Sequence, residues 1–295
     1  MEDAINKSKV LIEAMPYIKK FSGKIVVIKF GGNSLGDDAV RKAVLQDIVF
    51  MSVVGMCPVL VHGGGPHINK KLKESGIEFK FVKGLRVTDI KTMAVVDEAL
   101  TEVNHILVEE LQEMGAKAFG LIGKENKLLI ADKINSETDI GYAGSVESVD
   151  TTVVSRLITD RIIPVISPVS IGKDRCLYNV NADEAASKIA VGLCAEKLVV
   201  LTNVDGVQSD KKDPGSLLHS ISFKDAQYLM EKGKIEGGMI PKVQACLHAL
   251  DGGVKKSHMV NAELKHALLL EIFTHEGIGT EIIKIGHRTE ETKDI

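Results

Sequence analysis

Apolar residues recur along the chain with two different periods, which divide it into alternating strands and helices. The run at 25–30, whose first four residues are Ile or Val, is typical of a strand buried on both faces of a parallel sheet. Another buried strand is expected to start at Lys197. The same pattern predicts strands at 59–61, 117–122, 128–131, 162–166, 176–178, 257–260 and 280–285.

Longer segments carry apolar residues three and four positions apart, which is the spacing of an amphipathic helix. The clearest is 88–114, and Gly115 follows it in the position that often ends a helix. Further helices are expected at 37–54, 66–75, 150–159, 182–194, 222–232, 239–251 and 262–273.

The alternation of strands and helices predicts an α/β fold, in which a mostly parallel sheet has helices on both sides. Residues 124–148 interrupt it with a polar, glycine-containing stretch that predicts a hairpin lying over the functional site. The pattern changes again after Ala195, and 208–219 is typical of an exposed loop. We therefore divide one compact domain into an N-terminal helix (1–22), an N-terminal lobe (23–195) and a C-terminal lobe (196–295).

The segment before the first strand predicts an amphipathic helix with one narrow, largely apolar stripe. Pro16 lacks a backbone donor and should kink or break this helix near Glu13. The stripe either packs on its own domain or binds a neighbouring subunit, and the pattern alone leaves both open. Its members are Ala4, Ser8, Leu11, Met15 and Ile18.

Two strands run directly into glycines. The strand at 25–30 is followed by Gly31 and Gly32, and a helix is expected soon after. A strand, glycine turn and helix in this order aim backbone N–H groups at phosphate, and Lys29 would add a positive charge. The motif HGGGP at 62–66 repeats the arrangement one unit later. Two cradles for phosphate or carboxylate facing one site are expected, although each alone could be a plain turn.

Composition and charge narrow the function. The net charge of −3 gives no basic footprint for nucleic acid, and 4% aromatic residues without tryptophan argue against base-stacking or carbohydrate clefts. The cysteines are widely spaced, as expected for reduced thiols in an intracellular protein. No apolar run reaches the ~18–20 residues of a membrane span and no signal peptide is evident, so we expect a cytoplasmic protein, or a stromal one if plastid-encoded. The cysteines are Cys57, Cys176, Cys194 and Cys246.

Several charged residues add to the two glycine turns. Arg86 precedes the long helix and is suited to a carboxylate, although a surface salt bridge is an equal alternative. Asp183 lies at a strand-to-helix junction, where it either favours the helix N-terminus or holds a catalytic lysine. Lys242 follows a further glycine turn, or it simply faces water. Together these residues are typical of a site for phosphoryl transfer between anions, in which the protein positions substrates and neutralises charge.

Five motifs in this order resemble the amino acid kinase family, and the resemblance extends from the N-terminal helix to Ile285. It implies a three-layer αβα sandwich with a mostly parallel central sheet, whose N-terminal part binds an acyl amino acid and whose C-terminal part binds ATP. The motifs are KFGGN (29–33), HGGGP (62–66), GLRVT (84–88), NVNAD (179–183) and GGMIPK (237–242).

The resemblance implies ATP-dependent phosphorylation of the γ-carboxylate of N-acetyl-L-glutamate to N-acetyl-L-glutamyl 5-phosphate, the second step of arginine biosynthesis. Lys29 and Lys242 would be catalytic, with Asp183 orienting both. Mg²⁺ would bridge the phosphates of ATP without a direct protein ligand. The implied substrate-binding residues are Gly64, Gly65, Arg86 and Asn179. The implied ATP-binding residues are Gly31, Gly32, Thr202, Asn203, Val204, Asp205, Gly206, Val207, Gly237, Gly238 and Met239.

The N-terminal helix resembles the extension of arginine-inhibited family members, in which such helices interlace three dimers into a hexameric ring. L-arginine would then bind between this helix and the C-terminal part. Glu271 lies in an otherwise apolar helix and needs a partner, either a guanidinium or a salt bridge at the helix end. The implied arginine-site residues are Tyr17, Lys211, His258, Glu271, Glu276, Gly277, Ile278 and Gly279.

Two alternatives remain. Another kinase of the family would act on glutamate, aspartate, carbamate or a nucleotide, but Arg86 together with Asn179 favours an N-acylated amino acid. A non-catalytic amino-acid sensor is disfavoured because both Lys29 and Lys242 are present.

Overall fold

The computed structural model describes residues 2–210, 213–274 and 277–284. It confirms the predicted α/β class, because one eight-stranded sheet forms the centre of the molecule in the order β12-β14-β13-β11-β1-β2-β8-β5. All neighbouring pairs in this sheet are parallel except β13 and β14. The strands are β1 (Ile25–Phe30), β2 (Cys57–His62), β5 (Ala118–Ile122), β8 (Ile163–Ser167), β11 (Lys197–Thr202), β12 (Ser220–Ser222), β13 (Lys256–Asn261) and β14 (Thr280–Ile283).

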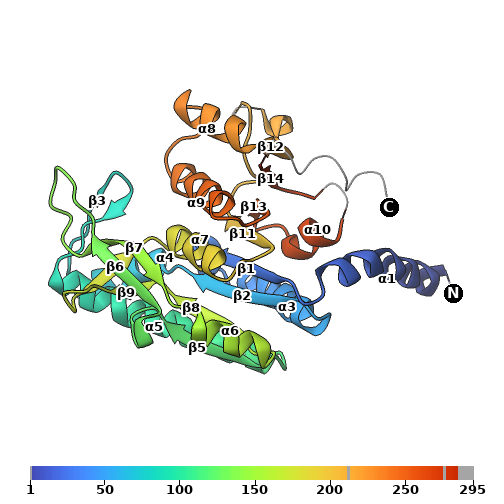
Figure 1. The fold of residues 1–295 in the computed structure, drawn as a ribbon, viewed down its shortest axis with the longest axis horizontal. Coiled ribbons are helices and arrows are strands. Elements are labelled where there is room, and N and C mark those ends of the chain that lie inside the picture. The colour runs from blue at the N-terminus through green and yellow to red at the C-terminus, as the bar shows by residue number, and fades with distance from the viewer. Residues whose placement is uncertain (1, 211–212, 275–276, 285–295) are drawn as a thin grey trace.

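Helices cover both faces of the sheet, as Figure 1 shows. In β1, Val26, Ile28 and Phe30 pack with the first set of helices, whereas Val27 packs with the second, as the two-residue period of a strand requires. The first set is α3 (Asp38–Val53), α5 (Ile90–Glu113) and α10 (Ala267–Phe273). The second set is α6 (Thr152–Thr159), α7 (Ala182–Gly192), α8 (Phe223–Glu231) and α9 (Met239–Asp251).

A smaller four-stranded barrel lies at one end of the molecule. The hairpin expected within 124–148 is confirmed, since β6 (Leu129–Lys133) and β7 (Ala143–Val149) pair antiparallel. They close into a barrel with β9 (Val169–Ile171) and β10 (Leu177–Val180). A hairpin of β3 (Phe81–Val82) and β4 (Leu85–Arg86) projects next to this barrel, between α4 (Gly65–Glu74) and α5.

Some predicted elements differ in extent. The expected helix at 262–273 begins only at Ala267, because His266 adopts a left-handed conformation and precedes the first helical turn. The short elements β3, β4, β9 and β12 were not predicted, since two or three residues carry no recognisable period. The remaining short helical segments are α2 (Asn33–Gly36), η1 (Glu125–Lys127) and η2 (Pro214–Ser216).

The N-terminal helix α1 (Glu2–Phe21) extends away from the body of the molecule (Figure 1). Of the kink or break predicted near Glu13, the break does not occur, because the helix continues through Pro16. Pro16 is exposed, as is Ile12 one turn earlier, so water can hydrate the Ile12 carbonyl that the proline leaves without its helical partner. None of the helices in the described ranges combines the length and the apolar character needed to cross a membrane.

Candidate active site

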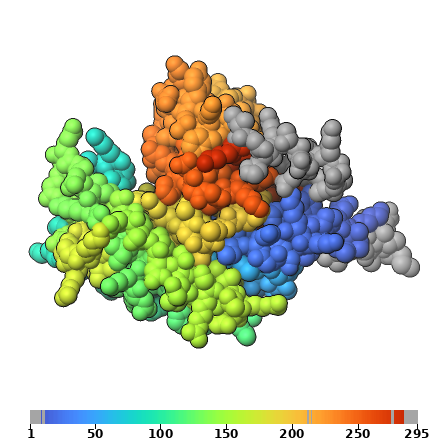
Figure 2. Space-filling view, in the orientation of Figure 1, coloured from blue at the N-terminus to red at the C-terminus, as the bar shows by residue number. Residues whose placement is uncertain are grey.

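A cavity of about 240 Å³ opens at the carboxyl ends of β1 and β2, at the edge of the sheet where ligands commonly bind in open α/β folds. Figure 2 shows the surface hollowed between the cyan projection that contains the β3–β4 hairpin and the orange C-terminal part. The lining comes from the two glycine turns, the β3–β4 hairpin, the end of β10 and the start of α7. Segments from distant parts of the sequence therefore converge on one site.

Two lysines meet one carboxylate in this site. Lys29 shares the face of Val27 in β1, which α7 covers, and its Nζ lies 2.9 Å from Asp183 Oδ1. Lys242, in the first turns of α9, places its Nζ 3.1 Å from Asp183 Oδ2. The alternative in which Asp183 caps α7 is not needed, because Asn181 is the capping residue and accepts a hydrogen bond from the Asp183 amide.

Burial and charge act against each other in this cluster. Burial alone would raise the pKa of Asp183, but the charges of Lys29 and Lys242 outweigh it and hold this pKa below its usual range. Burial lowers the pKa of Lys29, attraction to Asp183 opposes that effect, and repulsion from Lys242 adds to it. With all three groups ionised, one positive charge remains uncompensated, which favours an anion in the cavity.

The two glycine turns touch each other. A Cβ atom on Gly31 would lie 3.2 Å from the Gly63 Cα, so a side chain there would force the turns apart. The Gly63 amide donates to the Phe30 carbonyl at 2.8 Å, which joins the turn after β2 to the end of β1. Gly32, Gly64 and Gly65 all line the cavity, as the sequence predicted for two facing cradles. Gly65 is also the first residue of α4, whose N-terminus points backbone donors at this space.

Arg86 is buried, with 7% of its surface exposed, so the alternative of a surface salt bridge is wrong. Its guanidinium lies between the rings of Phe79 and Phe81, with Cζ 5.0 Å and 4.7 Å from their centroids. Nη2 donates to Asn69 Oδ1, whereas the buried Nη1 finds no acceptor in the described ranges. Burial lowers the pKa of Arg86 to about 10, so the group stays protonated at neutral pH and offers a donor to a carboxylate.

Asn179 lies on the same wall as Arg86. Its Nδ2 donates to Thr88 Oγ1 at 3.2 Å, and the Thr88 hydroxyl donates to the Arg86 carbonyl at 2.9 Å. Thr88 therefore connects two predicted substrate-binding residues that are far apart in the sequence. The sequence reasoning missed Asn69, Phe79, Phe81 and Thr88 as supports of Arg86, because nothing in their spacing predicts these contacts.

Gly32 lines this cavity, whereas the other predicted ATP-binding segments, 202–207 after β11 and 237–239 at the start of α9, do not. Thr202 is the last residue of β11, which pairs with β1, and its side chain is 4% exposed. Asp205 accepts from Asn261 Nδ2 at 2.8 Å, and the Val207 amide donates to Thr280 Oγ1 at 2.8 Å. The other predicted residues are Asn203 and Val204, which are exposed, Gly206, which is buried against Thr280, and Gly237, Gly238 and Met239 at the start of α9, next to Lys242.

The predicted arginine-site residues gather near α10, apart from the cavity. His258 Nδ1 lies 2.6 Å from Glu271 Oε1, and Glu271 Oε2 accepts from the amides of Ile278 at 2.7 Å and Gly279 at 2.9 Å. Glu271 therefore has partners within its own chain. Gly277 packs against the same carboxylate, and the Tyr17 ring lies 6.5 Å from the Phe273 ring. Lys211 and Glu276 are outside the described residues.

Lys197 extends this second cluster, and the sequence reasoning missed it. Its buried Nζ lies 3.3 Å from His258 Nε2 and 4.8 Å from the centroid of Phe21, the last residue of α1. Burial, followed by repulsion from Lys256, lowers the pKa of Lys197 to about 8. The start of β11 is thus connected to β13, α10 and α1.

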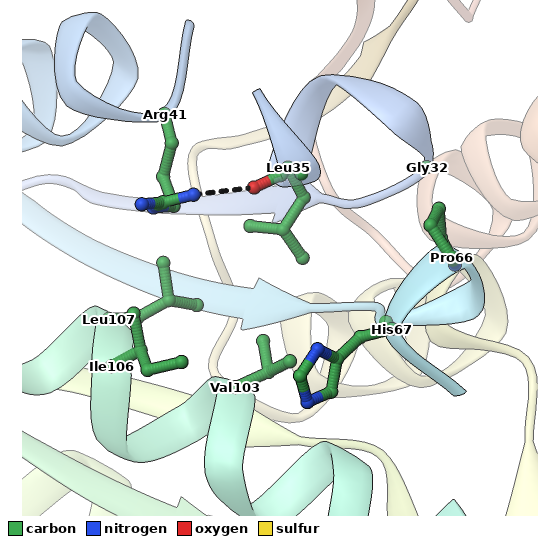
Figure 3. A pocket seen from close by; sticks show the side chains of 10 residues that line it. Gly32, Leu35, Arg41, Pro66, His67, Val103, Ile106 and Leu107 are labelled. Atoms are coloured by element: carbon green, nitrogen blue, oxygen red, sulfur yellow. Dashed lines mark hydrogen bonds between the residues drawn. The ribbon is translucent and has the colours of Figure 1, made fainter. Parts of the chain in front are cut away.

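A second cavity, of about 160 Å³, is lined by residues of both glycine turns and of α5 (Figure 3). Figure 3 shows Val103, Ile106 and Leu107 of α5 along one side of it, with Leu35 opposite. Arg41 donates to the Leu35 carbonyl at 3.2 Å, and Glu110 neutralises its charge at 2.8 Å. The rest of this lining is mainly apolar and the charge of Arg41 is already paired, so the first cavity is the candidate active site. Both cavities share Gly32 and Gly64, and the second is completed by Gly36, Pro66 and His67.

Residues 24–261 match the amino acid kinase family. The acetylglutamate kinase of Thermoanaerobacter pseudethanolicus is 51% identical over 283 residues, which cover 96% of this chain and 95% of that protein. The acetylglutamate kinase of Heliobacterium modesticaldum is 46% identical over 295 residues, which cover 96% of this chain and all of that protein.

A solved structure shares the fold. The N-acetylglutamate synthase of Neisseria gonorrhoeae, complexed with coenzyme A and N-acetyl-glutamate, superimposes with a TM-score of 0.82 at 27% identity. The match covers 94% of this chain but only 63% of that chain, so the chain spans less than two thirds of the synthase. The same synthase complexed with coenzyme A and L-arginine gives a TM-score of 0.80 at 25% identity.

Proposed function

The chain belongs to the amino acid kinase family, and we propose that it transfers the γ-phosphoryl group of ATP to the γ-carboxylate of N-acetyl-L-glutamate. The products are N-acetyl-L-glutamyl 5-phosphate and ADP, as in the acetylated route to arginine. Relatives that are about half identical over nearly their full length and carry the acetylglutamate kinase name support this substrate. Such a biosynthetic enzyme works in the cytoplasm, or in the stroma if a plastid encodes it.

The observation that carries the proposal is the meeting of Lys29 and Lys242 at Asp183, at the edge of a cavity that also contains Arg86. The γ-carboxylate oxygen attacks the γ-phosphorus and the bond to the ADP oxygen breaks, so negative charge concentrates on the transferring group. Two lysines held at fixed positions stabilise that charge without reorganising during the reaction. A general base is not required, because the attacking carboxylate is ionised near neutral pH.

Other residues of the cavity bind the acyl amino acid in this proposal. Arg86 Nη1 is a buried, charged donor and pairs with the α-carboxylate, and Asn179 bonds to the same group. The backbone amides of Gly64 and Gly65 hold the substrate from the opposite wall. Asp183 orients both lysines, and an Asp183→Asn exchange should therefore affect them together.

The C-terminal lobe binds ATP in this proposal, and the N-terminal lobe binds the acyl amino acid. The segments at 202–207 and 237–239 lie at the same sheet edge as Lys29 and line the nucleotide, while Gly31 and Gly32 donate to its phosphates. Mg²⁺ would accompany ATP without a direct protein ligand and would neutralise part of the phosphate charge. Both oxygens of the Asp183 carboxylate already contact lysines, so this residue is not a metal ligand in the described arrangement.

A coupled assay of ADP release with ATP, Mg²⁺ and a panel of acceptors tests the proposal. N-acetyl-L-glutamate should be the preferred acceptor over glutamate, aspartate, carbamate and nucleoside monophosphates. Robust activity on unacetylated glutamate alone would mean that glutamate, and not N-acetyl-L-glutamate, is the substrate. Inactivity towards every acceptor would favour the alternative of a non-catalytic amino-acid sensor.

We also propose that L-arginine inhibits the enzyme and that α1 assembles it into a hexamer of three dimers. Ile12 and Met15 of α1 are 65% and 58% exposed, an apolar surface that suits a helix from another subunit. The N-acetylglutamate synthase that shares this fold has been solved in complex with L-arginine, which supports the proposal that such a fold can bind this ligand. Repeating the assay with millimolar L-arginine, together with a measurement of molar mass by light scattering, tests both statements.

A further inference from the structure

A buried hydrogen-bonded network lies directly beneath the glycine turn that follows β2. His62, the last residue of β2, is fully buried, and its Nδ1 lies 2.9 Å from the Gly63 carbonyl oxygen. Its Nε2 lies 3.1 Å from Asn104 Nδ2 of α5, and the same Nδ2 donates to the Val165 carbonyl of β8 at 2.9 Å. The network therefore runs from one backbone carbonyl to another through two side chains.

The two carbonyls at its ends fix the direction of every hydrogen bond. A carbonyl can only accept, so Asn104 presents its NH₂ group to Val165 and to His62, and His62 presents Nδ1–H to Gly63. The remaining His62 nitrogen, Nε2, accepts from Asn104, which requires a neutral imidazole in the Nδ1–H tautomer. Burial lowers the pKa of His62 to about 4, in agreement with this neutral form.

The bond to the Gly63 carbonyl also sets the direction of the next amide. In a planar trans peptide, the carbonyl of Gly63 and the N–H of Gly64 point in opposite directions. His62 follows Leu60 at the two-residue period and lies on the α5 face of the sheet, so the Gly64 N–H points toward the opposite face, where Lys29 lies. No acceptor for this N–H is found in the described ranges, and Gly64 lines the candidate active site.

The surrounding glycines leave room for this arrangement. A Cβ atom on Gly64 would lie 2.6 Å from Leu100 Cδ2, and one on Gly120 would lie 2.1 Å from Asn104 Oδ1. Leu100 and Asn104 are one turn apart on α5, so a single helix face supports both the glycine turn and the network. Asn104 Oδ1 itself finds no hydrogen-bond partner in the described ranges. A buried acceptor without a partner costs stability, which argues that the network serves the site above it.

We infer that His62 is a positioning residue, which with Asn104 aims the Gly64 N–H at the N-acetylated amino acid in the active site. The inference rests on the proposed function. His62 touches no substrate in this arrangement. It acts through the Gly63–Gly64 peptide, and its loss should therefore weaken binding of the acyl amino acid more than binding of ATP.

A pair of substitutions separates this effect from general damage. His62→Leu removes the donor to the Gly63 carbonyl and should raise KM for N-acetyl-L-glutamate about tenfold or more, as for a lost hydrogen bond to a charged group. KM for ATP should stay within about twofold, because the nucleotide is bound elsewhere. His62→Asn keeps an NH₂ donor where Nδ1 lies and should restore most of the affinity. Equal KM values in the wild type and His62→Leu, or equal increases in KM for both substrates, would overturn the inference.

A measurement on the unmodified protein covers the case in which His62→Leu does not fold. Nitrogen NMR of protein labelled in histidine should show the His62 imidazole neutral and in the Nδ1–H tautomer between pH 6 and 8, with the His62 signals assigned by their absence from His62→Asn. An Nε2–H tautomer at His62 would leave the Gly63 carbonyl without its donor and would refute the inference. A wild type that does not phosphorylate N-acetyl-L-glutamate at all would instead refute the proposed function, whatever the tautomer.

Discussion

Asp183 is the residue on which both lysines depend. Lys29 lies 2.9 Å and Lys242 3.1 Å from this carboxylate, and these three buried or half-buried charges are stable only as a set. Removing the carboxylate leaves two ammonium groups that repel each other in a site of low polarity. The cluster therefore links catalysis, pH dependence and stability through one side chain.

Asp183→Asn should lower kcat by about a hundredfold or more, since it disturbs both lysines, and should destabilise the fold by about 3–5 kcal/mol. The attraction that opposes the burial effect on Lys29 disappears, so the pKa of Lys29 falls further. Lys29 then loses its proton at lower pH, and the alkaline limb of the kcat profile should move to lower pH. Asp251→Asn, at an exposed position, is the control. A profile identical to that of the wild type would remove Asp183 from its orienting role.

Arg86→Lys tests whether a fork of donors, rather than a charge, is required. Lysine cannot bond to Asn69 and to a carboxylate in the same planar geometry, and it does not stack between Phe79 and Phe81 in the same way. KM for N-acetyl-L-glutamate should rise about tenfold to a hundredfold, with KM for ATP nearly unchanged. Arg156→Lys, at an exposed position on α6, should leave both values as they are. Unchanged KM values in Arg86→Lys would mean that another group binds the α-carboxylate.

His62 makes the fold sensitive to acid. Its pKa is about 4 in the folded chain and near 6.5 when unfolded, so the unfolded state binds more protons between these values. The contribution of His62 to the free energy of unfolding is therefore fully present above pH 6.5. It decreases by about 3 kcal/mol as the pH falls toward 4. In urea unfolding, His62→Asn should lose less stability than the wild type between pH 7 and pH 4.5. The same loss in both proteins would mean that His62 does not titrate in this range.

At the scale of elements, long periodic segments were predicted from sequence within a few residues. β1, α3, α5 and α9 all match, because the three helices each bury one regular face and β1 is buried on both of its faces. In the sequence, neighbouring glycines mark Lys29, Arg86 and Lys242 as candidate site residues, whereas Asp183 is marked by its strand-to-helix junction. The sequence could not indicate that Asn69 supports Arg86, or that Asn104 contacts His62 from another element. These contacts depend on side-chain packing between elements, which leaves no local pattern.

In the part of the N-terminal helix whose side chains are described, the contacts with the body of the molecule lie in the last turns. Phe21 is buried, whereas Ile12 and Met15 are exposed, so deleting the whole helix would also damage the core. The double variant Ile12→Lys and Met15→Lys should leave the subunit folded and reduce the molar mass in light scattering from a hexamer to a dimer. Glu13→Lys, an exposed change on the same helix, is the control for charge. A hexamer that survives the double variant would place the assembly contact elsewhere.

At the scale of the whole molecule, one sheet connects the active site with the cluster near α10. β1 pairs with β11 and β11 with β13, so the strands of the proposed ATP-binding lobe continue the sheet that carries Lys29. Lys197 begins β11 and Thr202 ends it, and His258 lies three residues before Asn261, about 10 Å along β13. The cluster around Glu271 therefore contacts the same two strands whose other ends reach the proposed nucleotide segments. A ligand that displaces His258 from Glu271 would act on both strands.

Glu271→Gln tests this connection. The amide still accepts from the backbone of Ile278 and Gly279, so the loop should remain in place, but the negative charge that would bind a guanidinium is lost. The concentration of L-arginine giving half-inhibition should rise about tenfold or more, while kcat without arginine changes little. Glu263→Gln, an exposed change in the same part of the chain, should be inhibited by L-arginine at the same concentration as the wild type. If Glu271→Gln were inhibited as strongly as the wild type, arginine would not bind at this carboxylate, and the Glu271–His258 pair would serve only to connect α10 to β13.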